Sequence, residues 1–177
     1  MPDASHGCVT GDRMQDTPKG EDFAVRPLAP SDPRARRLIR MLDRLQHSMY
    51  PAESNHLDPV ESLEHDDATF LAAFVAGEAV GCGAVKRMPP SRTSPRYGEI
   101  KRMFVDPEVR GRGIGGALLD ALESSLISHG IFIARLETGI RQFDALALYG
   151  RHGYVRISPF GEYGEDPLSV FYEKRLA

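Results

Sequence analysis

One stretch constrains the fold of this chain more than any other: a strand, a run of glycines and a helix follow one another between Glu99 and His129. The strand reads EIKRMFV over residues 99–105, and the glycine run reads RGRGIGG over residues 110–116. Apolar and small residues then recur at roughly every third or fourth position, as on one face of an α-helix, and Gly130 is typical of the residue that ends one. The predicted buried face of this helix comprises Ile114, Leu118, Ala121, Leu122, Ser125 and His129.

The glycine run predicts a site for a phosphate or pyrophosphate. Glycine has no Cβ, so the backbone can turn tightly and approach a ligand closely. The first N–H groups of a helix have no partner within the helix, and they lie at the positive end of its dipole. Arg110 and Arg112 add two positive charges at the same place.

A dinucleotide-binding turn is one interpretation of these glycines. Gly111, Gly113 and Gly116 fit the pattern G-x-G-x-x-G, and Glu137 follows where that fold places its ribose-binding acid. Three features count against it: residues 106–110 separate the strand from Gly111, two arginines would crowd the loop, and the chain after Glu137 is too short for the rest of a doubly wound sheet. A Walker loop is excluded because no Lys-Ser or Lys-Thr follows the glycines.

Alternation, helical spacing and turn residues predict an α+β fold with a mixed, largely antiparallel sheet flanked by helices. Strands are expected at residues 23–26, 69–75, 79–87, 97–105, 131–138, 155–158 and 168–174. Ser31 or Asp32 is expected to cap a first helix, a short helix begins at Asp58, and a last helix covers residues 145–151. The first helix should bury Ala35, Leu38, Ile39, Leu42, Leu45 and Met49, and its water-facing residues are Arg34, Arg36, Arg37, Arg40 and Arg44.

Composition indicates one ordinary globular domain, residues 23–177, behind a mobile tail at residues 1–22 that has few large apolar residues. The net charge of −3 gives no electrostatic case for nucleic acid. No apolar run approaches the ~20 residues that span a bilayer, and the N-terminus lacks the apolar segment of a signal peptide. Two cysteines make no disulfide framework, and the six histidines show no metal-ligand spacing. The expected location is the cytoplasm.

The residues around the glycine run resemble the GCN5-related N-acetyltransferase (GNAT) superfamily. Arg110, Gly113 and Gly115 match its signature R/Q-x-x-G-x-G/A, which binds the pyrophosphate of acetyl-coenzyme A (acetyl-CoA). Downstream, residues 136–138, 147–149 and 153–154 are similar to the family's fifth strand, the following helix and its end. With weaker matches, the resemblance extends from residue 23 to residue 176.

The resemblance implies how the donor would bind. In the family, the fourth and fifth strands splay apart and the pantetheine arm lies in the gap. Backbone groups of the fourth strand would bind that arm, and one N–H could stabilise the oxyanion. Gln142 stands where many relatives have an asparagine that contacts the arm. The expected cofactor-binding residues are Met103, Phe104, Val105, Arg110, Gly111, Arg112, Gly113, Ile114, Gly115, Gly116 and Gln142.

The resemblance also implies a catalytic set. Tyr149 matches the general acid that protonates the leaving sulfur, although a tyrosine on an amphipathic helix can equally be a packing residue. Glu137 and Glu99 are alternative general bases, because family members use a carboxylate at one or the other position. The structural alternative for either glutamate is a salt bridge to a nearby lysine or arginine.

The expected partner is a small-molecule or peptide amine, with no nucleic acid and no membrane, and a homodimer is left open. His56 and Asn55 lie in the loop that covers the acceptor site in the family, and Arg141 is a further candidate contact. Two other functions remain as alternatives at this point: a non-catalytic acyl-CoA-binding or regulatory domain, and, more distantly, a dinucleotide-dependent oxidoreductase.

Overall fold

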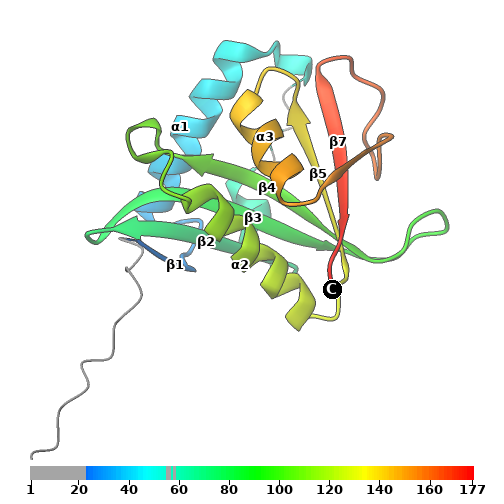
Figure 1. Cartoon of the computed structure of the whole chain (residues 1–177), viewed down its shortest axis with the longest axis horizontal. Helices are drawn as coiled ribbons and strands as arrows, with labels where there is room; N and C mark the ends of the chain where they lie inside the picture. The colour runs from blue at the N-terminus through cyan, green and yellow to red at the C-terminus, as the bar shows by residue number, and fades with distance from the viewer. Residues whose placement is uncertain (1–22, 55–56, 58) are drawn as a thin grey trace, which may run out of the picture.

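The computed structural model describes residues 23–54, 57 and 59–177, so the tail predicted at residues 1–22 lies outside the described residues. A seven-stranded sheet has the order β1-β2-β3-β4-β5-β7-β6 (Figure 1). Neighbouring strands run antiparallel except for β4 and β5, which are parallel. The strands are β1 (Ala24–Pro27), β2 (Ala68–Val75), β3 (Glu78–Met88), β4 (Tyr97–Val105), β5 (Ile133–Gly139), β6 (Val155–Ile157) and β7 (Ser169–Arg175).

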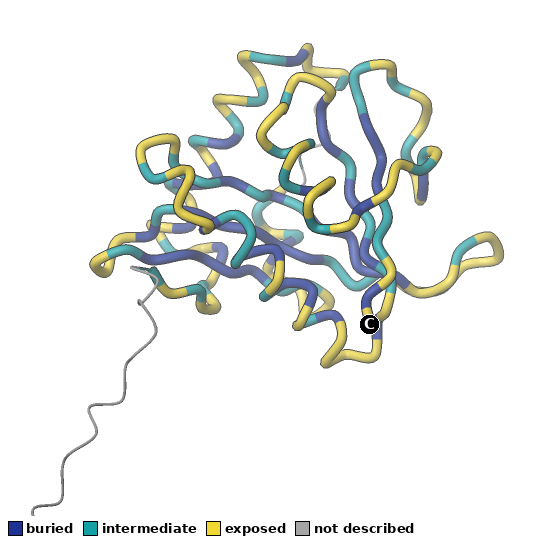
Figure 2. The backbone as a smooth tube through the Cα atoms, viewed as in Figure 1, coloured by how far each residue is buried: buried dark blue, intermediate teal, exposed yellow. Residues whose placement is uncertain are grey.

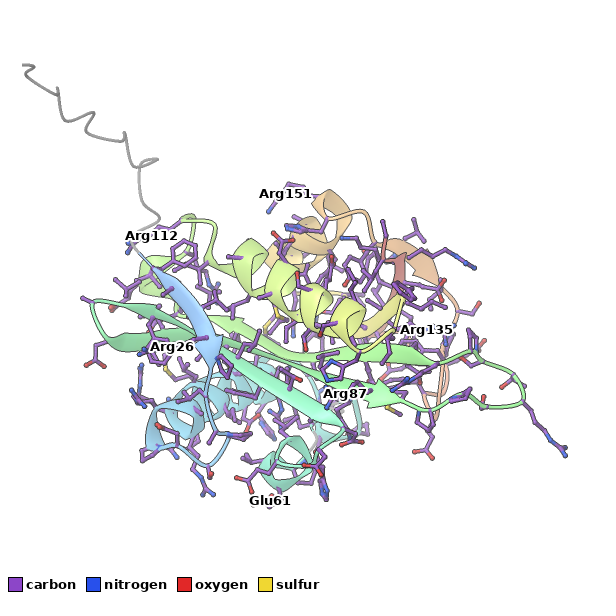
Figure 3. The ribbon with its side chains drawn as sticks, turned by 90° about the horizontal axis from the view of Figure 1, so that it is seen from below. Arg26, Glu61, Arg87, Arg112, Arg135 and Arg151 are labelled. Carbon is purple, nitrogen blue, oxygen red and sulfur yellow. The ribbon has the colours of Figure 1, made fainter. Side chains whose placement is uncertain are left out.

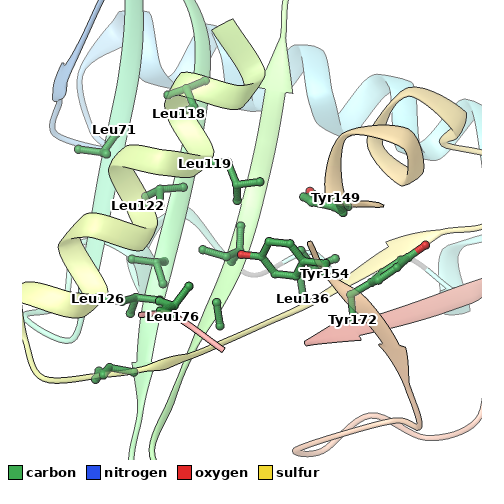
Figure 4. Close-up of a cluster of buried hydrophobic side chains, with 14 of the residues drawn as sticks. Leu71, Leu118, Leu119, Leu122, Leu126, Leu136, Tyr149, Tyr154, Tyr172 and Leu176 are labelled. Carbon is green, nitrogen blue, oxygen red and sulfur yellow. The ribbon is translucent and has the colours of Figure 1, made fainter. Parts of the chain in front are cut away.

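The helices cover both faces of this sheet, as the view from below shows (Figure 3). The α-helices are α1 (Pro33–Met49), α2 (Ile114–Ser128) and α3 (Phe143–Arg151), and the 3₁₀ helices are η1 (Ala52–Ser54), η2 (Val60–Leu63) and η3 (Pro107–Val109). The sheet face under α2 and α3, called the α2 face here, carries the larger cluster of buried side chains, including Val85, Ile100 and Leu136 (Figure 4). The opposite α1 face carries Phe70, Cys82 and Phe104. The predicted α+β fold is confirmed, and a doubly wound sheet is wrong.

The short helix expected from Asp58 is wrong in type. Asp58 itself lies outside the described residues, and residues 60–63 form the 3₁₀ helix η2. Its N-cap residue, Pro59, has no side chain that can accept a hydrogen bond from the first turn. Leu63 is buried against the α1 face and Val60 packs beside it. A single 3₁₀ turn places residues three apart on one side, so it is sufficient to bury both.

Asp32 is the N-cap of α1, as predicted. Its Oδ1 accepts hydrogen bonds from the Arg34 backbone N–H at 2.8 Å and from Nε at 3.0 Å. These bonds lower the pKa of Asp32 to about 2. Two details of the predicted helix are wrong. Leu45 is 37% exposed, and Arg37 is half-buried and donates a 2.5 Å hydrogen bond to the Ala79 carbonyl.

The buried face of α2 is broader than predicted and ends before His129. Leu119 and Leu126 are fully buried (Figure 4). His129 lies beyond the end of the helix and is exposed, in keeping with the exposed backbone at the C-terminal end of α2 (Figure 2). A helix packed on a sheet buries a broad stripe, so leucines beside the expected line also reach the core. Gly130 has φ +70°, and the Ile131 N–H returns to the Leu126 carbonyl at 3.0 Å. That left-handed glycine ends the helix as predicted.

Strands β4 and β5 separate after a short paired region (Figure 1). Among the described residues, they pair at Gly98–Ala134, Glu99–Arg135 and Ile100–Leu136. Beyond these positions, residues 101–105 of β4 and 137–139 of β5 diverge, which confirms the predicted splay. Within the part of the chain that the structure describes, no helix combines the length and apolar character of a membrane span.

Candidate active site

A pocket opens where β4 and β5 separate. Strands β4 and β5 supply two of its walls, α3 supplies a third, and α1 with η1 supplies the fourth. The lining residues are Leu42, Gln46, Tyr50, Ser54, Ile100, Lys101, Arg102, Met103, Glu137, Thr138, Gly139, Gln142 and Tyr149. Four residues predicted from the sequence therefore meet in one cavity: Met103, Glu137, Gln142 and Tyr149.

Tyr149 projects from α3 into this pocket and is 4% exposed. Its ring packs edge-on against Tyr154, with centroids 5.7 Å apart, and lies 6.2 Å from the ring of Tyr172 (Figure 4). Burial, and then the negative charge of Glu137, raise the pKa of Tyr149 well above its usual value. The hydroxyl therefore stays protonated at neutral pH and can donate a proton or a hydrogen bond.

Glu137 lies on β5 and also lines the pocket. The Ser169 hydroxyl, on the neighbouring strand β7, donates a 2.6 Å hydrogen bond to Glu137 Oε1. A carboxylate and a protonated phenol thus belong to the same cavity, which is a pair of groups suited to proton transfer.

Glu99, the alternative base, is held in a different environment. Its Oε1 accepts a 2.5 Å hydrogen bond from the Tyr163 hydroxyl, and Lys101 Nζ lies 2.9 Å from the same oxygen. Lys101 Nζ also donates to the Tyr163 hydroxyl at 3.1 Å. The Glu99 side chain is 8% exposed and is not among the pocket-lining residues. The salt bridge considered from the sequence as its structural alternative is present.

The glycine run forms the entry to α2. Gly111 and Gly113 have φ values of +78° and +82°, a conformation that favours glycine. A Cβ at either position would meet no heavy atom within 4 Å, so space remains beside the backbone for a ligand. Gly113 is the N-cap and offers no side-chain acceptor to the first N–H groups of this 15-residue helix. The residues present therefore fit a bound phosphate group.

Gly115 and Gly116 lie inside the first turn of α2 and face α3. A Cβ on Gly115 would lie 3.4 Å from Leu148, and one on Gly116 would lie 3.2 Å from His152. Because neither glycine has a side chain, α2 and α3 can approach each other closely here. This packing role is separate from any contact that the two glycines make with the donor. Ile114 is 2% exposed and anchors the helix start in the core.

Two arginines flank this entry. Arg110 donates from Nε to the Val105 carbonyl at 3.0 Å, and its Nη1 lies 3.3 Å from Asp144 Oδ2 at the start of α3. Arg110 thereby bridges the end of β4 and the beginning of α3. Arg112 is exposed beside the loop (Figure 3). Both positions are compatible with a negatively charged ligand at the N-terminus of α2.

The remaining predicted residues are placed as follows. Phe104 is buried on the α1 face and Val105 packs on the α2 face. Gln142 accepts a 3.0 Å hydrogen bond from the Thr138 hydroxyl. Arg141 is exposed and donates to the Met49 carbonyl at 2.9 Å, outside the lining set. The predicted contacts His56 and Asn55 lie outside the described residues.

Sequence reasoning missed Tyr50. It is the C-cap of α1, it lines the pocket, and its hydroxyl accepts a 2.8 Å hydrogen bond from the Arg141 N–H. Its ring leaves no room for a Cβ on Gly139, which would lie 2.2 Å away. A tyrosine followed by Pro51 indicated only the end of a helix, so its contact with the β5–α3 loop carried no local signal.

Arg102 was also missed. It lines the pocket, and its Nη1 forms an ion pair with Asp43 Oδ1 of α1. Its φ of +57° is unusual inside a strand, and the β3–β4 register shifts between Cys82 and Ala84, opposite this part of β4. In residues 23–54, 57 and 59–177, no group of three or more His, Cys, Asp or Glu side chains could hold a metal ion.

Known proteins resemble this chain in sequence. Residues 37–154 match the family model described as Acetyltransferase (GNAT) family. The chain is 46% identical over 139 residues to the IAA acetyltransferase of Azospirillum brasilense, covering 78% of this chain and 88% of that relative. It is 34% identical over 146 residues to the uncharacterized N-acetyltransferase YsnE of Bacillus subtilis, covering 80% of this chain and 93% of YsnE.

Solved structures resemble it in fold. A Klebsiella pneumoniae protein provisionally assigned as an acyl-CoA N-acyltransferase has a TM-score of 0.73 and 38% identity, covering 89% of this chain and 100% of that one. The PaiA N-acetyltransferase of Thermoplasma acidophilum, solved in complex with coenzyme A, has a TM-score of 0.65 at 19% identity, covering 86% and 98%. Fold, family match and identity agree: the chain belongs to the GNAT family of acetyltransferases.

Proposed function

We propose that this protein transfers the acetyl group of acetyl-CoA to a primary amine of a small molecule, an amino acid or a peptide N-terminus. The observation that carries the proposal is the pocket at the splayed strands, which brings together a carboxylate, Glu137, and a buried phenol, Tyr149. Acetyl transfer to an ammonium requires the loss of a proton from nitrogen and the return of a proton to sulfur. The two side chains match those two requirements.

The glycine entry to α2 supports the choice of donor. Gly111 and Gly113 leave the backbone accessible, and Arg110 and Arg112 supply positive charge beside the first N–H groups of the helix. These groups would hold the pyrophosphate. Gln142 and the main chain of residues 103–105 would bind the pantetheine arm, which would run along the split between β4 and β5 toward Tyr149. Acetyl-CoA supplies the activated acetyl group when bound.

Each protein group then has one role. Glu137 accepts the proton of the acceptor ammonium, directly or through one water, and the amine attacks the thioester carbonyl carbon. The carbon–nitrogen bond forms, the carbon–sulfur bond breaks, and Tyr149 gives its hydroxyl proton to the departing thiolate. We assign the base to Glu137 rather than Glu99, because Glu137 lines the pocket, whereas Glu99 does not line it and its carboxylate is already bound by Lys101 and Tyr163.

A panel of acceptors tests the proposal. Amines, amino acids and short peptides would be incubated with acetyl-CoA, with coenzyme A release and the mass of the product as readouts. The name of the Azospirillum brasilense relative adds IAA to the panel. We expect an acetylated product from at least one amine. Binding of acetyl-CoA without acetylation of any member would favour a non-catalytic acyl-CoA-binding domain.

A further inference from the structure

Strand β4 changes its facing pattern in the middle. In a regular strand, alternate residues face the same side, so Ile100 and Arg102 should share one side of the sheet. Instead, Ile100 and Met103 both pack on the α2 face, while Phe104 packs on the α1 face. One residue is therefore inserted between positions 100 and 103, as the β3–β4 register shift also indicates. This is a β-bulge.

Arg102 carries the backbone distortion of this bulge. Its φ of +57° lies in the left-handed region, where a Cβ is disfavoured. The other described non-glycine residue with a positive φ, Ala76, belongs to the tight β2–β3 turn, where such values are common. A residue with a Cβ keeps this conformation inside a strand only if its surroundings compensate for it.

Contacts from two neighbouring elements hold Arg102 in place. Its guanidinium forms an ion pair with Asp43 of α1, and the Arg102 side chain is only 5% exposed. Its carbonyl oxygen accepts a 3.5 Å hydrogen bond from the Cys82 thiol of β3. Burial raises the pKa of that thiol to about 12, so it stays protonated and able to donate.

The bulge begins directly after the last β4–β5 pair, Ile100–Leu136, which is where the strands separate. Residues 100–103 all line the pocket. The conformation of Arg102 thus decides how the β4 main chain faces the cavity that also contains Tyr149 and Glu137.

We infer that the Asp43–Arg102 ion pair is a positioning device for the reaction. It holds Arg102 in its left-handed conformation, and the bulge then presents the main chain of residues 101–103 to the thioester carbonyl of the bound donor. In this role the ion pair acts through the main chain of β4 and not through contact with the donor or the acceptor. This inference rests on the proposed function, because it needs a donor in the split.

Replacement of Arg102 by two different small residues separates this role from others. Arg102→Ala removes the ion pair but keeps a Cβ at a φ of +57°, so the bulge should relax and kcat should fall by roughly 10- to 100-fold. Arg102→Gly also removes the ion pair, but glycine adopts a positive φ freely. Arg102→Gly should therefore keep most of the kcat, and the acceptor KM should change little in either variant.

A second pair of variants tests Asp43. Asp43→Asn weakens the ion pair and should lower kcat, whereas adding Arg102→Gly to it should restore kcat to that of Arg102→Gly alone. Such non-additivity is the signature of two residues that act as one unit. Arg40→Ala, on an exposed position of the same helix, is the matched control and should behave as the wild type.

Three results would overturn the inference. Equal losses in Arg102→Ala and Arg102→Gly with a raised acceptor KM would mean that Arg102 binds the acceptor. A lowered melting temperature with unchanged kcat in all variants would make the pair purely structural. If Arg102→Ala does not fold, the double variant decides: the inference is wrong if adding Arg102→Gly to Asp43→Asn does not restore kcat to the value of Arg102→Gly alone.

A direct readout separates this inference from the proposed function. Hydrogen exchange of peptides that contain residues 101–105 reports the bulge without any turnover. We expect faster exchange there in Arg102→Ala and Asp43→Asn than in Arg102→Gly. Unchanged exchange in all three variants would refute the positioning role of the ion pair even if the enzyme is active. Conversely, the predicted exchange pattern would support that role even if no acceptor in the panel were acetylated.

Discussion

The hydroxyl of Ser169 donates a 2.6 Å hydrogen bond to the carboxylate of Glu137, joining β7 to the pocket wall on β5. The other candidate base, Glu99, is bound instead by Lys101 and by Tyr163. One carboxylate lines the pocket and the other serves as the centre of a buried polar network. The two glutamates should therefore respond differently to the same substitution.

Glu137→Gln should abolish the acidic limb of the pH–rate profile and lower kcat, because the amide cannot accept the ammonium proton. Glu99→Gln should keep that limb and lower the melting temperature, because its partners Lys101 and Tyr163 lose a charged acceptor. Initial rates from pH 5 to 9 report the acidic limb, and thermal unfolding reports the melting temperature. The assignment is wrong if Glu99→Gln loses the limb and Glu137→Gln keeps it.

Substitutions in the glycine entry should act on the donor. Arg110→Ala removes a charge-assisted contact, and Gly113→Val forces a Cβ into a φ of +82°. Both should weaken acetyl-CoA binding, measured by calorimetry, while the acceptor KM stays nearly unchanged. Arg156→Ala, at an exposed position on β6, is the control. Wild-type acetyl-CoA affinity in both variants would place the pyrophosphate elsewhere.

Acetyl-CoA should stabilise the folded protein and NADH should not. A ligand at a hundred times its Kd raises the free energy of unfolding by about 2.7 kcal/mol, which thermal unfolding detects readily. Coenzyme A without the acetyl group should also stabilise, because the expected phosphate contacts are the same. No thermal shift with acetyl-CoA at millimolar concentration would contradict the proposed donor.

Asp32, the N-cap residue of α1, should make the free energy of unfolding depend on pH in the acidic range. The hydrogen bonds from Arg34 lower the pKa of Asp32 from 3.8 to about 2, so the charged carboxylate stabilises the folded state. This stabilisation is present above pH 3.8 and is lost as the pH falls toward 2. Asp32→Ala should therefore melt at a lower temperature than the wild type at pH 6, and the difference should shrink at pH 2.5. A difference that does not change with pH would exclude the charge as its cause.

Local chemistry made part of the fold predictable. Three features follow from the properties of residues close together in the sequence: the helix cap at Asp32-Pro33, the helix end at the left-handed Gly130, and the glycine entry to α2. The Tyr163 contact with Glu99 joins positions 64 residues apart, so no local pattern signals it. Arg102 has no intrinsic preference for a positive φ, and the contacts that hold it, from Asp43 on α1 and Cys82 on β3, come from distant parts of the sequence. The pocket is assembled largely from such distant contacts, and for this reason its α1 wall was missed.

The most direct measurement of the central claim is the kcat of Tyr149→Phe on an acceptor identified in the panel. The substitution keeps the ring that packs against Tyr154 and Tyr172 and removes only the hydroxyl. Tyr172→Phe, in the same buried cluster but outside the pocket lining, is the matched control. If Tyr149 protonates the leaving thiolate, kcat falls by roughly 10²–10⁴ while acetyl-CoA affinity and melting temperature stay at wild-type values. A Tyr149→Phe enzyme with the kcat of the Tyr172→Phe control would contradict the account.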